Sequence, residues 1–229
     1  MFQSLKIKLI NEHIIIEGEQ SLLLDTGSPA SFHTAGLIKW GGDDIPVFTS
    51  VSGVSKEYIH ANVGVNVDGL VGMDIIHRYP VVIRLRDNML LIDDDTSYPR
   101  SFKCVELGPL AQGLIAIEMS VNRRAVRMIV DTGAPISYIN RTVVAGMTSE
   151  REVKDFHPLI GDYKTNTYRC EVAHINDDVP YCQEFGLLPN LLEATLSMIN
   201  VDGIIGVDLF KRYRIQIKDG KLFFPPQGI

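Results

Sequence analysis

The sequence of 229 residues contains few cysteines and no metal-binding spacing. Its three cysteines, Cys104, Cys170 and Cys182, form no CxxC pair and are odd in number, so neither a zinc cluster nor a disulfide framework is expected. Its six histidines include no HExxH motif. We therefore expect reduced, buried thiols and a protein that holds no metal ion and no other cofactor.

Long apolar runs and an excess of positive charge are also absent. Runs such as Leu22–Leu24 and Met128–Val130 are far below the roughly 18 residues that suggest a membrane span. The net charge of −6 argues against nucleic acid as a partner, because phosphate binding needs clustered Lys and Arg. The start, MFQSLKIKLINEH, alternates polar and apolar residues and lacks the apolar core of a secretory signal. We expect a first strand there, no membrane association and a cytoplasmic location.

Two blocks of sequence occur twice, in the same order. LLLDTGSP, which contains Asp25, returns as MIVDTGAP, which contains Asp131; VDGLVGMD returns in the same way as VDGIIGVD. The first block recurs after 106 positions and the second after 134, so the second copy contains about 28 additional residues. Two unrelated motifs in one order indicate an internal duplication. The hydrophobic-hydrophobic-Gly positions of the second block are Leu70, Val71, Gly72, Ile204, Ile205 and Gly206.

Each copy is predicted to be mostly β. Short apolar runs around the turns Asn11-Glu12-His13 and Asn122-Arg123-Arg124 are typical of hairpins, and they lead into the two DTG triplets. Trp40, next to two glycines, is expected in a surface turn or at the edge of a cleft. A closing hairpin is predicted in each copy, from Val81–Leu85 with Met89–Ile92 and from Ile215–Ile217 with Leu222–Phe224. Short helices are predicted over Met73–Tyr79, Leu191–Ile199 and Val207–Tyr213.

A stretch with acidic residues, Pro and Gly separates the two copies. We predict an N-terminal lobe over residues 1–95, a linker over 96–112 and a C-terminal lobe over 113–229. Asp93–Asp95 in this stretch is expected to be an exposed turn and not a metal site.

The repeated DTG triplets also predict chemistry. A carboxylate at the end of an apolar strand is costly unless it is hydrogen-bonded or shares a proton. The Thr offers a hydroxyl, and the Gly allows a backbone N–H to approach the carboxyl. A pseudo-twofold axis would place the two loops face to face, so that Asp25 and Asp131 meet and share a proton as an acid and a base.

The paired apolar-apolar-Asp-Thr-Gly-Ser/Ala motifs and the downstream hydrophobic-hydrophobic-Gly blocks resemble the aspartic proteases. The short halves and the block VDGLVGMDII are more similar to the retropepsin-like group than to the longer pepsins. The resemblance covers both halves outside the linker and the insertion in the second copy. It implies an all-β fold of two pseudo-twofold-related β-barrel lobes with short helices, in one chain for which a monomer is sufficient.

The resemblance implies an aspartic endopeptidase that hydrolyses peptide bonds with a water activated between Asp25 and Asp131. A peptide or protein substrate would lie extended in the cleft between the lobes. Ser28 is expected to donate a hydrogen bond to Asp25, whereas Ala134 cannot do so for Asp131, so Asp25 is expected to ionise more readily. The residues that would support the two loops are Thr26, Gly27, Ser28, Thr132, Gly133 and Ala134.

A flap is expected to cover the cleft. One candidate lies at Gly53 and Val54, with a return strand over Tyr58–Val63. The other lies at Gly161 and Tyr163, with a return strand over Tyr168–Val172. The polar residues around the second candidate depart from the apolar tips of retroviral flaps, which argues against two equivalent flaps.

Two other functions compete with this interpretation. The first is a catalytically weak or inactive retropepsin-like module that binds peptide or protein; intact DTG triplets in both halves argue against it. The second is an actin-like phosphotransferase, in which Asp-x-Gly loops bind nucleotide and magnesium. It needs longer alternating α and β segments than this chain contains.

Overall fold

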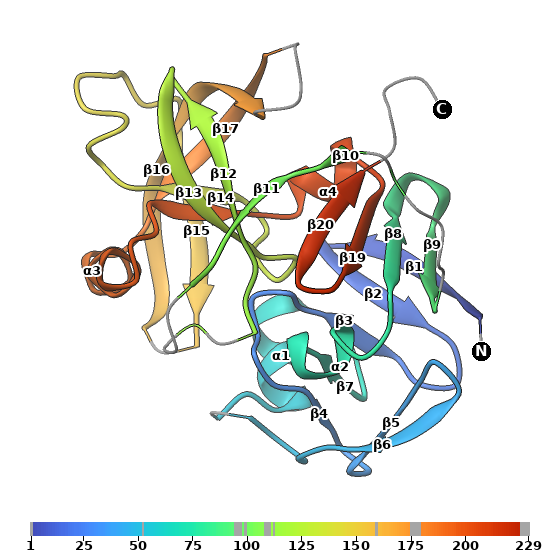
Figure 1. The fold of residues 1–229 in the computed structure, drawn as a ribbon. Helices are drawn as coiled ribbons and strands as arrows, with labels where there is room; N and C mark the ends of the chain where they lie inside the picture. Colours follow the sequence, from blue (N-terminus) through green and yellow to red (C-terminus); the bar gives the residue numbers. More distant parts are fainter. Residues whose placement is uncertain are drawn as a thin grey trace.

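The computed structural model is an all-β protein of two lobes, which are joined by a sheet to which both halves of the chain contribute (Figure 1). It describes residues 2–51, 53–93, 98, 100–107, 111, 113–158, 160–174 and 180–224. The predicted all-β, two-lobed fold is confirmed. The predicted limits at residues 95, 96 and 112 and most of the acidic turn lie outside the described residues, so the domain boundaries stay a prediction.

The elements follow one another in two similar series. In the first half they are β1 (Gln3–Ile10), β2 (His13–Glu17), β3 (Leu22–Leu24), β4 (Phe32–His33), β5 (Leu37–Trp40), β6 (Asp43–Pro46), α1 (Lys56–Val63), β7 (Gly69–Val71), α2 (Met73–Ile76), β8 (Val81–Arg84), the 3-10 helix η1 (Leu85–Asp87) and β9 (Met89–Ile92). In the second half they are β10 (Arg100–Ser101), β11 (Lys103–Val105), β12 (Ala116–Val121), β13 (Arg124–Val130), β14 (Ser137–Ile139), β15 (Glu152–His157), β16 (Gly161–His174), β17 (Tyr181–Leu187), α3 (Asn190–Met198), β18 (Gly203–Ile205), α4 (Asp208–Arg212), β19 (Ile215–Lys218) and β20 (Lys221–Phe224).

The predicted hairpin turns form in both copies. Asn11 and Glu12 have φ angles of 48° and 64°, and Asn122 and Arg123 have φ angles of 50° and 64°. Two consecutive residues with positive φ make a tight turn whose twist matches antiparallel strands, and Asn tolerates this conformation well. As a result β1 pairs with β2, and β12 pairs with β13.

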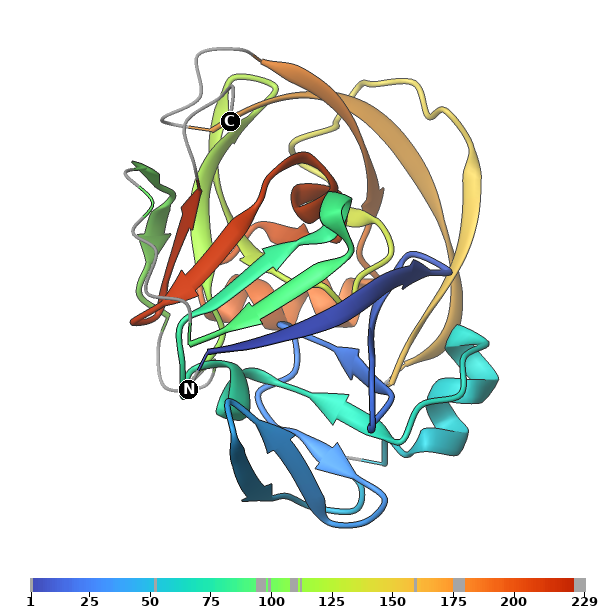
Figure 2. The ribbon, with the colours of Figure 1, turned by 90° about the vertical axis from the view of Figure 1, so that its right-hand side faces the viewer.

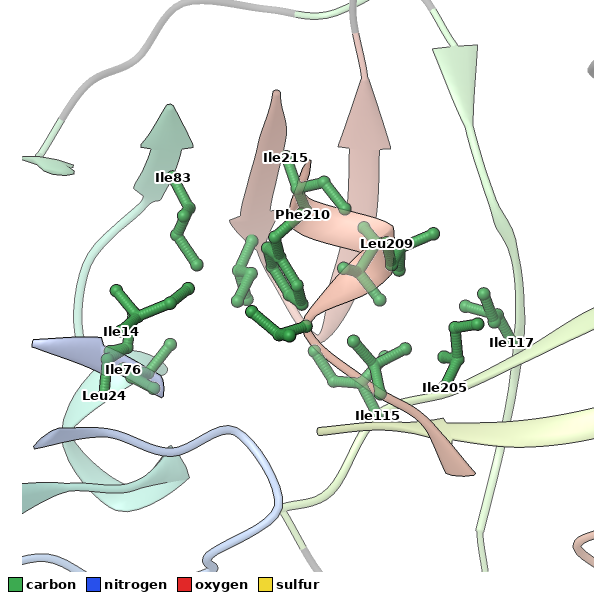
Figure 3. Close-up of a cluster of buried hydrophobic side chains, with 14 of the residues drawn as sticks. Ile14, Leu24, Ile76, Ile83, Ile115, Ile117, Ile205, Leu209, Phe210 and Ile215 are labelled. Carbon is green, nitrogen blue, oxygen red and sulfur yellow. The ribbon is translucent and has the colours of Figure 1, made fainter. Parts of the chain in front are cut away.

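The two predicted closing hairpins, β8–β9 and β19–β20, are confirmed, and they join each other in one sheet. β8 pairs antiparallel with β19, so that Ile83 lies opposite Ile215. Figure 2 shows this sheet in the middle of the molecule. One hydrophobic core therefore connects both halves beneath it. Figure 3 labels ten of its side chains: Ile14, Leu24, Ile76, Ile83, Ile115, Ile117, Ile205, Leu209, Phe210 and Ile215.

The strand predicted over Tyr58–Val63 is wrong, because these residues belong to helix α1. The Ser55 side chain accepts a hydrogen bond from the Tyr58 N–H at 3.3 Å, and Gly64 ends the helix in the left-handed region with φ 77°. Ile59 and Val63 are buried and pack on a hydrophobic cluster of the N-terminal lobe. Caps at both ends and this buried face stabilise a helix where the sequence pattern indicates a strand.

Other local predictions have mixed outcomes. The helices α2, α3 and α4 form where short helices are predicted, and Leu196 of α3 packs on its own lobe. Trp40 does not lie at a surface or cleft edge: its side chain is fully buried in the core. All three cysteines are free, but of the thiols expected to be buried only Cys170 is; Cys104 is half-buried and Cys182 is exposed. In the described part of the chain, no helix is long and apolar enough to cross a membrane.

Candidate active site

The two DTG loops begin where buried parallel strands end. β3 pairs in parallel with β7, and β13 pairs in parallel with β18. The Asp25 N–H donates to the Val71 carbonyl at 3.0 Å, and the Asp131 N–H donates to the Ile205 carbonyl, also at 3.0 Å. The hydrophobic-hydrophobic-Gly blocks therefore hold both aspartates in register from the neighbouring strand.

The glycine of each block allows the DTG loop to pass close over it. A Cβ on Gly72 would lie 2.7 Å from the Ser28 carbonyl oxygen, and a Cβ on Gly206 would lie 2.6 Å from the Ala134 carbonyl oxygen. Any side chain there would displace the loop that carries the carboxylate. This contact explains why the two blocks recur together in both copies.

Two serines that the sequence analysis missed complete this support. The Ser31 hydroxyl accepts the Gly72 N–H at 2.8 Å, and the Ser137 hydroxyl accepts the Gly206 N–H at 2.9 Å. Both serines are fully buried. A signal was present in the sequence, because each serine follows its aspartate by six positions.

The two threonines brace the loops across the interface between the lobes. Thr26 Oγ1 accepts the Thr132 N–H at 2.9 Å and donates to the Val130 carbonyl at 2.9 Å. Thr132 Oγ1 accepts the Thr26 N–H at 3.0 Å and donates to the Leu24 carbonyl at 2.7 Å. Both side chains are buried, so these four bonds are made without competition from water.

The two glycines of the triplets bring the carboxyl groups together. The Gly27 N–H donates to Asp25 Oδ1 at 2.9 Å, and the Gly133 N–H donates to Asp131 Oδ1 at 2.7 Å. A Cβ on Gly27 would lie 2.2 Å from Asp131 Cγ, and a Cβ on Gly133 would lie 2.7 Å from Asp25 Oδ1. Each glycine thus binds the carboxylate of its own loop and leaves room for that of the other.

The paired carboxyls lie close enough for each to change the pKa of the other. Burial and the neighbouring charge of Asp131 raise the pKa of Asp25 well above its usual value. Burial also raises the pKa of Asp131, but the Gly133 N–H, the Asp25 side chain and the charge of His13 oppose that rise. The two carboxyls therefore have unequal environments, and more groups around Asp131 than around Asp25 stabilise a negative charge.

The predicted role of the Ser28 side chain is wrong. The Ser28 hydroxyl donates to the Ala30 carbonyl at 2.8 Å and not to Asp25. Ser28 acts on Asp25 through its backbone N–H, as Ala134 does on Asp131. The Ser/Ala difference between the two motifs therefore does not polarise the pair.

His13 is a third titratable side chain beside the dyad that the sequence analysis did not select. It is buried, lines the same cleft, and places Nδ1 at 2.6 Å from the Asn11 carbonyl oxygen. Burial lowers the pKa of His13, while the Asn11 carbonyl, Asp131 and Gly133 oppose that change. In the sequence it is only the last residue of a hairpin turn, so no local pattern marks it.

A cleft of about 310 Å³ lies over the dyad, and both Asp25 and Asp131 line it. Its other walls come from both lobes and are largely apolar. They include Leu23, Phe32, Val54, Ile59, Leu188 and Leu192.

The β15–β16 hairpin of the C-terminal lobe borders this cleft. Its turn contains Gly161 with φ 82°, and Tyr163 lines the cleft, so the second pair of flap candidates lies on a hairpin beside the site. Phe156 of β15 reaches α1, where its ring centroid is 6.0 Å from that of Tyr58. Figure 2 shows these strands extending to α1 of the other lobe.

The N-terminal flap candidate has a different structure. Val51 and Val54 form a bridge around Gly53, which has φ 80°, and the chain then enters α1. The strand that would complete a hairpin is replaced by this helix, so the predicted equivalent of β15–β16 is wrong for the N-terminal lobe. Val54 nevertheless lines the cleft.

The two lobes with their facing DTG loops resemble the fold of a solved aspartic proteinase. The crystal structure of aspartic proteinase from Irpex lacteus is similar, with a TM-score of 0.51 and 12% sequence identity. The similarity covers 99% of this chain and 98% of that one, and at this identity it concerns the fold. No protein-family model and no curated protein sequence matches the chain. The described residues contain no group of three or more His, Cys, Asp or Glu side chains placed to bind a metal ion.

Proposed function

We propose that the protein is a single-chain aspartic endopeptidase of the retropepsin-like type, with Asp25 and Asp131 as its catalytic residues. The observation that carries the proposal is the pair of half-buried carboxyls, which accept hydrogen bonds from the Gly27 and Gly133 N–H groups and line a cleft between the lobes. The raised pKa of Asp25 supports it, because an acid and a base are then available in one site at the same pH.

In this mechanism a water between the two carboxyls attacks the scissile carbonyl carbon. Asp131 accepts a proton from the water, while protonated Asp25 donates a hydrogen bond to the carbonyl oxygen. The tetrahedral gem-diol then collapses as a proton passes to the leaving nitrogen. Neither carboxyl bonds to the substrate, so no acyl-enzyme forms.

The substrate is an extended peptide that lies along the cleft. Its backbone pairs with an edge of the β15–β16 hairpin, which serves as the flap and excludes water from the reaction. Apolar walls from both lobes accept side chains next to the scissile bond.

The test is cleavage of a mixed peptide library between pH 3 and pH 8, with and without pepstatin, and with products identified by mass spectrometry. We expect cleavage that pepstatin inhibits and that is lost in Asp25→Asn and in Asp131→Asn. Asp219→Asn, in the exposed turn between β19 and β20, is the matched control and should retain wild-type cleavage.

Two results would contradict the proposal. Cleavage that survives both catalytic substitutions would show that the dyad is not the active site. Peptide binding by the wild-type protein without any cleavage would identify a retropepsin-like binding module instead.

A further inference from the structure

The β15–β16 hairpin brings a third carboxylate into the cleft. Asp155 of β15 lines the cleft together with the catalytic pair. Asp155 Oδ1 accepts the Phe156 N–H at 2.8 Å, and Oδ2 accepts the hydroxyls of Tyr138 and Tyr163, the latter at 3.4 Å. Tyr138 belongs to β14 and is buried, so the carboxylate has a fixed position between the hairpin and the body of the lobe.

This carboxylate has no part in the proposed mechanism and no cationic partner among the described residues. None of the ion pairs among the described residues includes Asp155, whereas Glu152 on the same strand pairs with Lys164 at 2.7 Å. A carboxylate removed from water without a cation is unfavourable. A carboxylate that is shielded from water without a cation, and that lies beside a proposed active site, is a candidate for binding a substrate.

The hydrogen-bonding capacity of the cluster defines what it binds. Both tyrosine hydroxyls donate their hydrogen to Asp155, so the cluster presents only acceptors to the cleft: a remaining lone pair of Oδ1 and the two phenolic oxygens. A complementary group must bring several donors. Lys carries three N–H donors and Arg carries five. The two tyrosine rings, with centroids 6.3 Å apart, add aromatic surface that favours a cation.

The surrounding charges favour a cation as well. No described residue lining the cleft is Lys or Arg, and Asp131 adds negative charge to it. The two histidines of the cleft, His13 and His157, have pKa values lowered by burial, so they are neutral at pH 7 and above. An adjoining cavity, which Asp155 also lines, contains Lys154, Asp162 and Lys164. Lys164 pairs with Glu152 at 2.7 Å, and Lys154 and Asp162 oppose each other in charge.

We propose that Asp155, with the phenolic oxygens of Tyr138 and Tyr163, forms a subsite for a Lys or Arg side chain of the substrate. This inference rests on the proposed function, because the subsite lies in the same cleft as the dyad. Burial raises the pKa of Asp155 to about 6, so the subsite is charged at pH 7.5 and mostly neutral at pH 4.5. Basic side chains are therefore selected at the higher pH.

The test uses peptides in which each position within four residues of a cleaved bond is replaced by Arg, Lys, norleucine or Glu. At one position we expect kcat/KM for Arg or Lys to exceed that for norleucine by about 10-fold at pH 7.5. This ratio falls to about 2-fold or less at pH 4.5 and in Asp155→Asn. Glu152→Gln, which removes a carboxylate from the outer side of the same strand, retains the full ratio. A ratio near one in the wild-type protein, or a ratio that survives in Asp155→Asn, overturns the subsite.

A binding measurement separates this inference from the proposed function. Fluorescence polarisation at pH 7.5 compares the Arg and norleucine peptides on Asp25→Asn and on the double variant Asp25→Asn/Asp155→Asn. Tighter binding of the Arg peptide, by about 10-fold, is expected for the first variant only. Such binding, together with no cleavage of any peptide by the wild-type protein, supports the subsite and overturns the protease. Cleavage without an Arg preference in either assay supports the protease and overturns the subsite.

Discussion

Replacing Thr132 by Val removes one hydroxyl from the contact between the two DTG loops and nearly preserves the shape of the side chain. Thr132 Oγ1 accepts the Thr26 N–H at 3.0 Å and donates to the Leu24 carbonyl at 2.7 Å, and its side chain is fully buried. A buried polar group that loses its partner costs about 1–3 kcal/mol. With two backbone groups left unpaired, the free energy of unfolding should fall by about 2–6 kcal/mol. That is a large part of the roughly 5–15 kcal/mol by which proteins are stable.

Urea unfolding followed by the fluorescence of the single, buried Trp40 measures this loss. For an m-value of about 3 kcal/mol/M, the midpoint should fall by roughly 0.7–2 M. Thr132→Ser is the matched control, because it keeps the hydroxyl and loses only a methyl group, at about 1 kcal/mol. Equal midpoints for the Val and Ser variants would show that the crossed hydroxyls do not hold the lobes together.

Three further predictions concern the site. Gly27→Ala places a Cβ 2.2 Å from Asp131 Cγ, so kcat/KM for peptide cleavage should fall by about 100-fold or more. Gly18→Ala is the control, because a Cβ there has nothing within 4 Å, and it should leave kcat/KM unchanged. Equal activity of the two variants would refute the close approach of Gly27 to Asp131. Folding raises the pKa of Asp155 to about 6, so its contribution to stability is full below about pH 4 and is lost as the pH rises through 6. In urea unfolding, Asp155→Asn should therefore be more stable than wild type at pH 8 by roughly 2–3 kcal/mol and equal to it at pH 3–4; a constant difference would contradict this. The charge of His13 lowers the pKa of Asp131, so His13→Ala should raise that pKa. The acid limb of the pH profile of kcat/KM should therefore move to higher pH. An unchanged limb would show that His13 does not act on the dyad.

The proximity of Asp25 and Asp131 could be predicted from sequence because its geometry is set locally. Asp25 and Asp131 each follow a short apolar strand, and each is held by a glycine-containing block that recurs in the same order. Backbone hydrogen bonds and close contacts that depend on Gly27 and Gly133 then decide where the carboxyls lie. Such constraints leave a readable pattern in the residues themselves.

The rest of the site depends on which elements pack together, and no local pattern records this. His13 reaches Asp131 only because the β1–β2 turn folds over the second DTG loop. Asp155 enters the cleft only because β15, which pairs with β16, also reaches Tyr138 of β14. The replacement of an N-terminal flap by α1 is an intermediate case. Ser55 and Gly64 are residue types that commonly cap helices, so the sequence is compatible with a helix between them. The glycine turn at Gly53 followed by the apolar residues of Tyr58–Val63 is equally compatible with a strand, which is what was predicted.

Sharing of one proton by the Asp25 and Asp131 carboxyls can be tested directly. Carbon-13 NMR of labelled aspartate carboxyls, recorded from pH 2 to pH 9 and assigned with the two Asn variants, tests it without a substrate. We expect two coupled titration steps, the higher one well above the usual value of about 3.9, and a fall of that higher pKa when the partner carboxyl is replaced by Asn. Two carboxyls that titrate independently near 3.9, each unaffected by substitution of the other, would contradict the account.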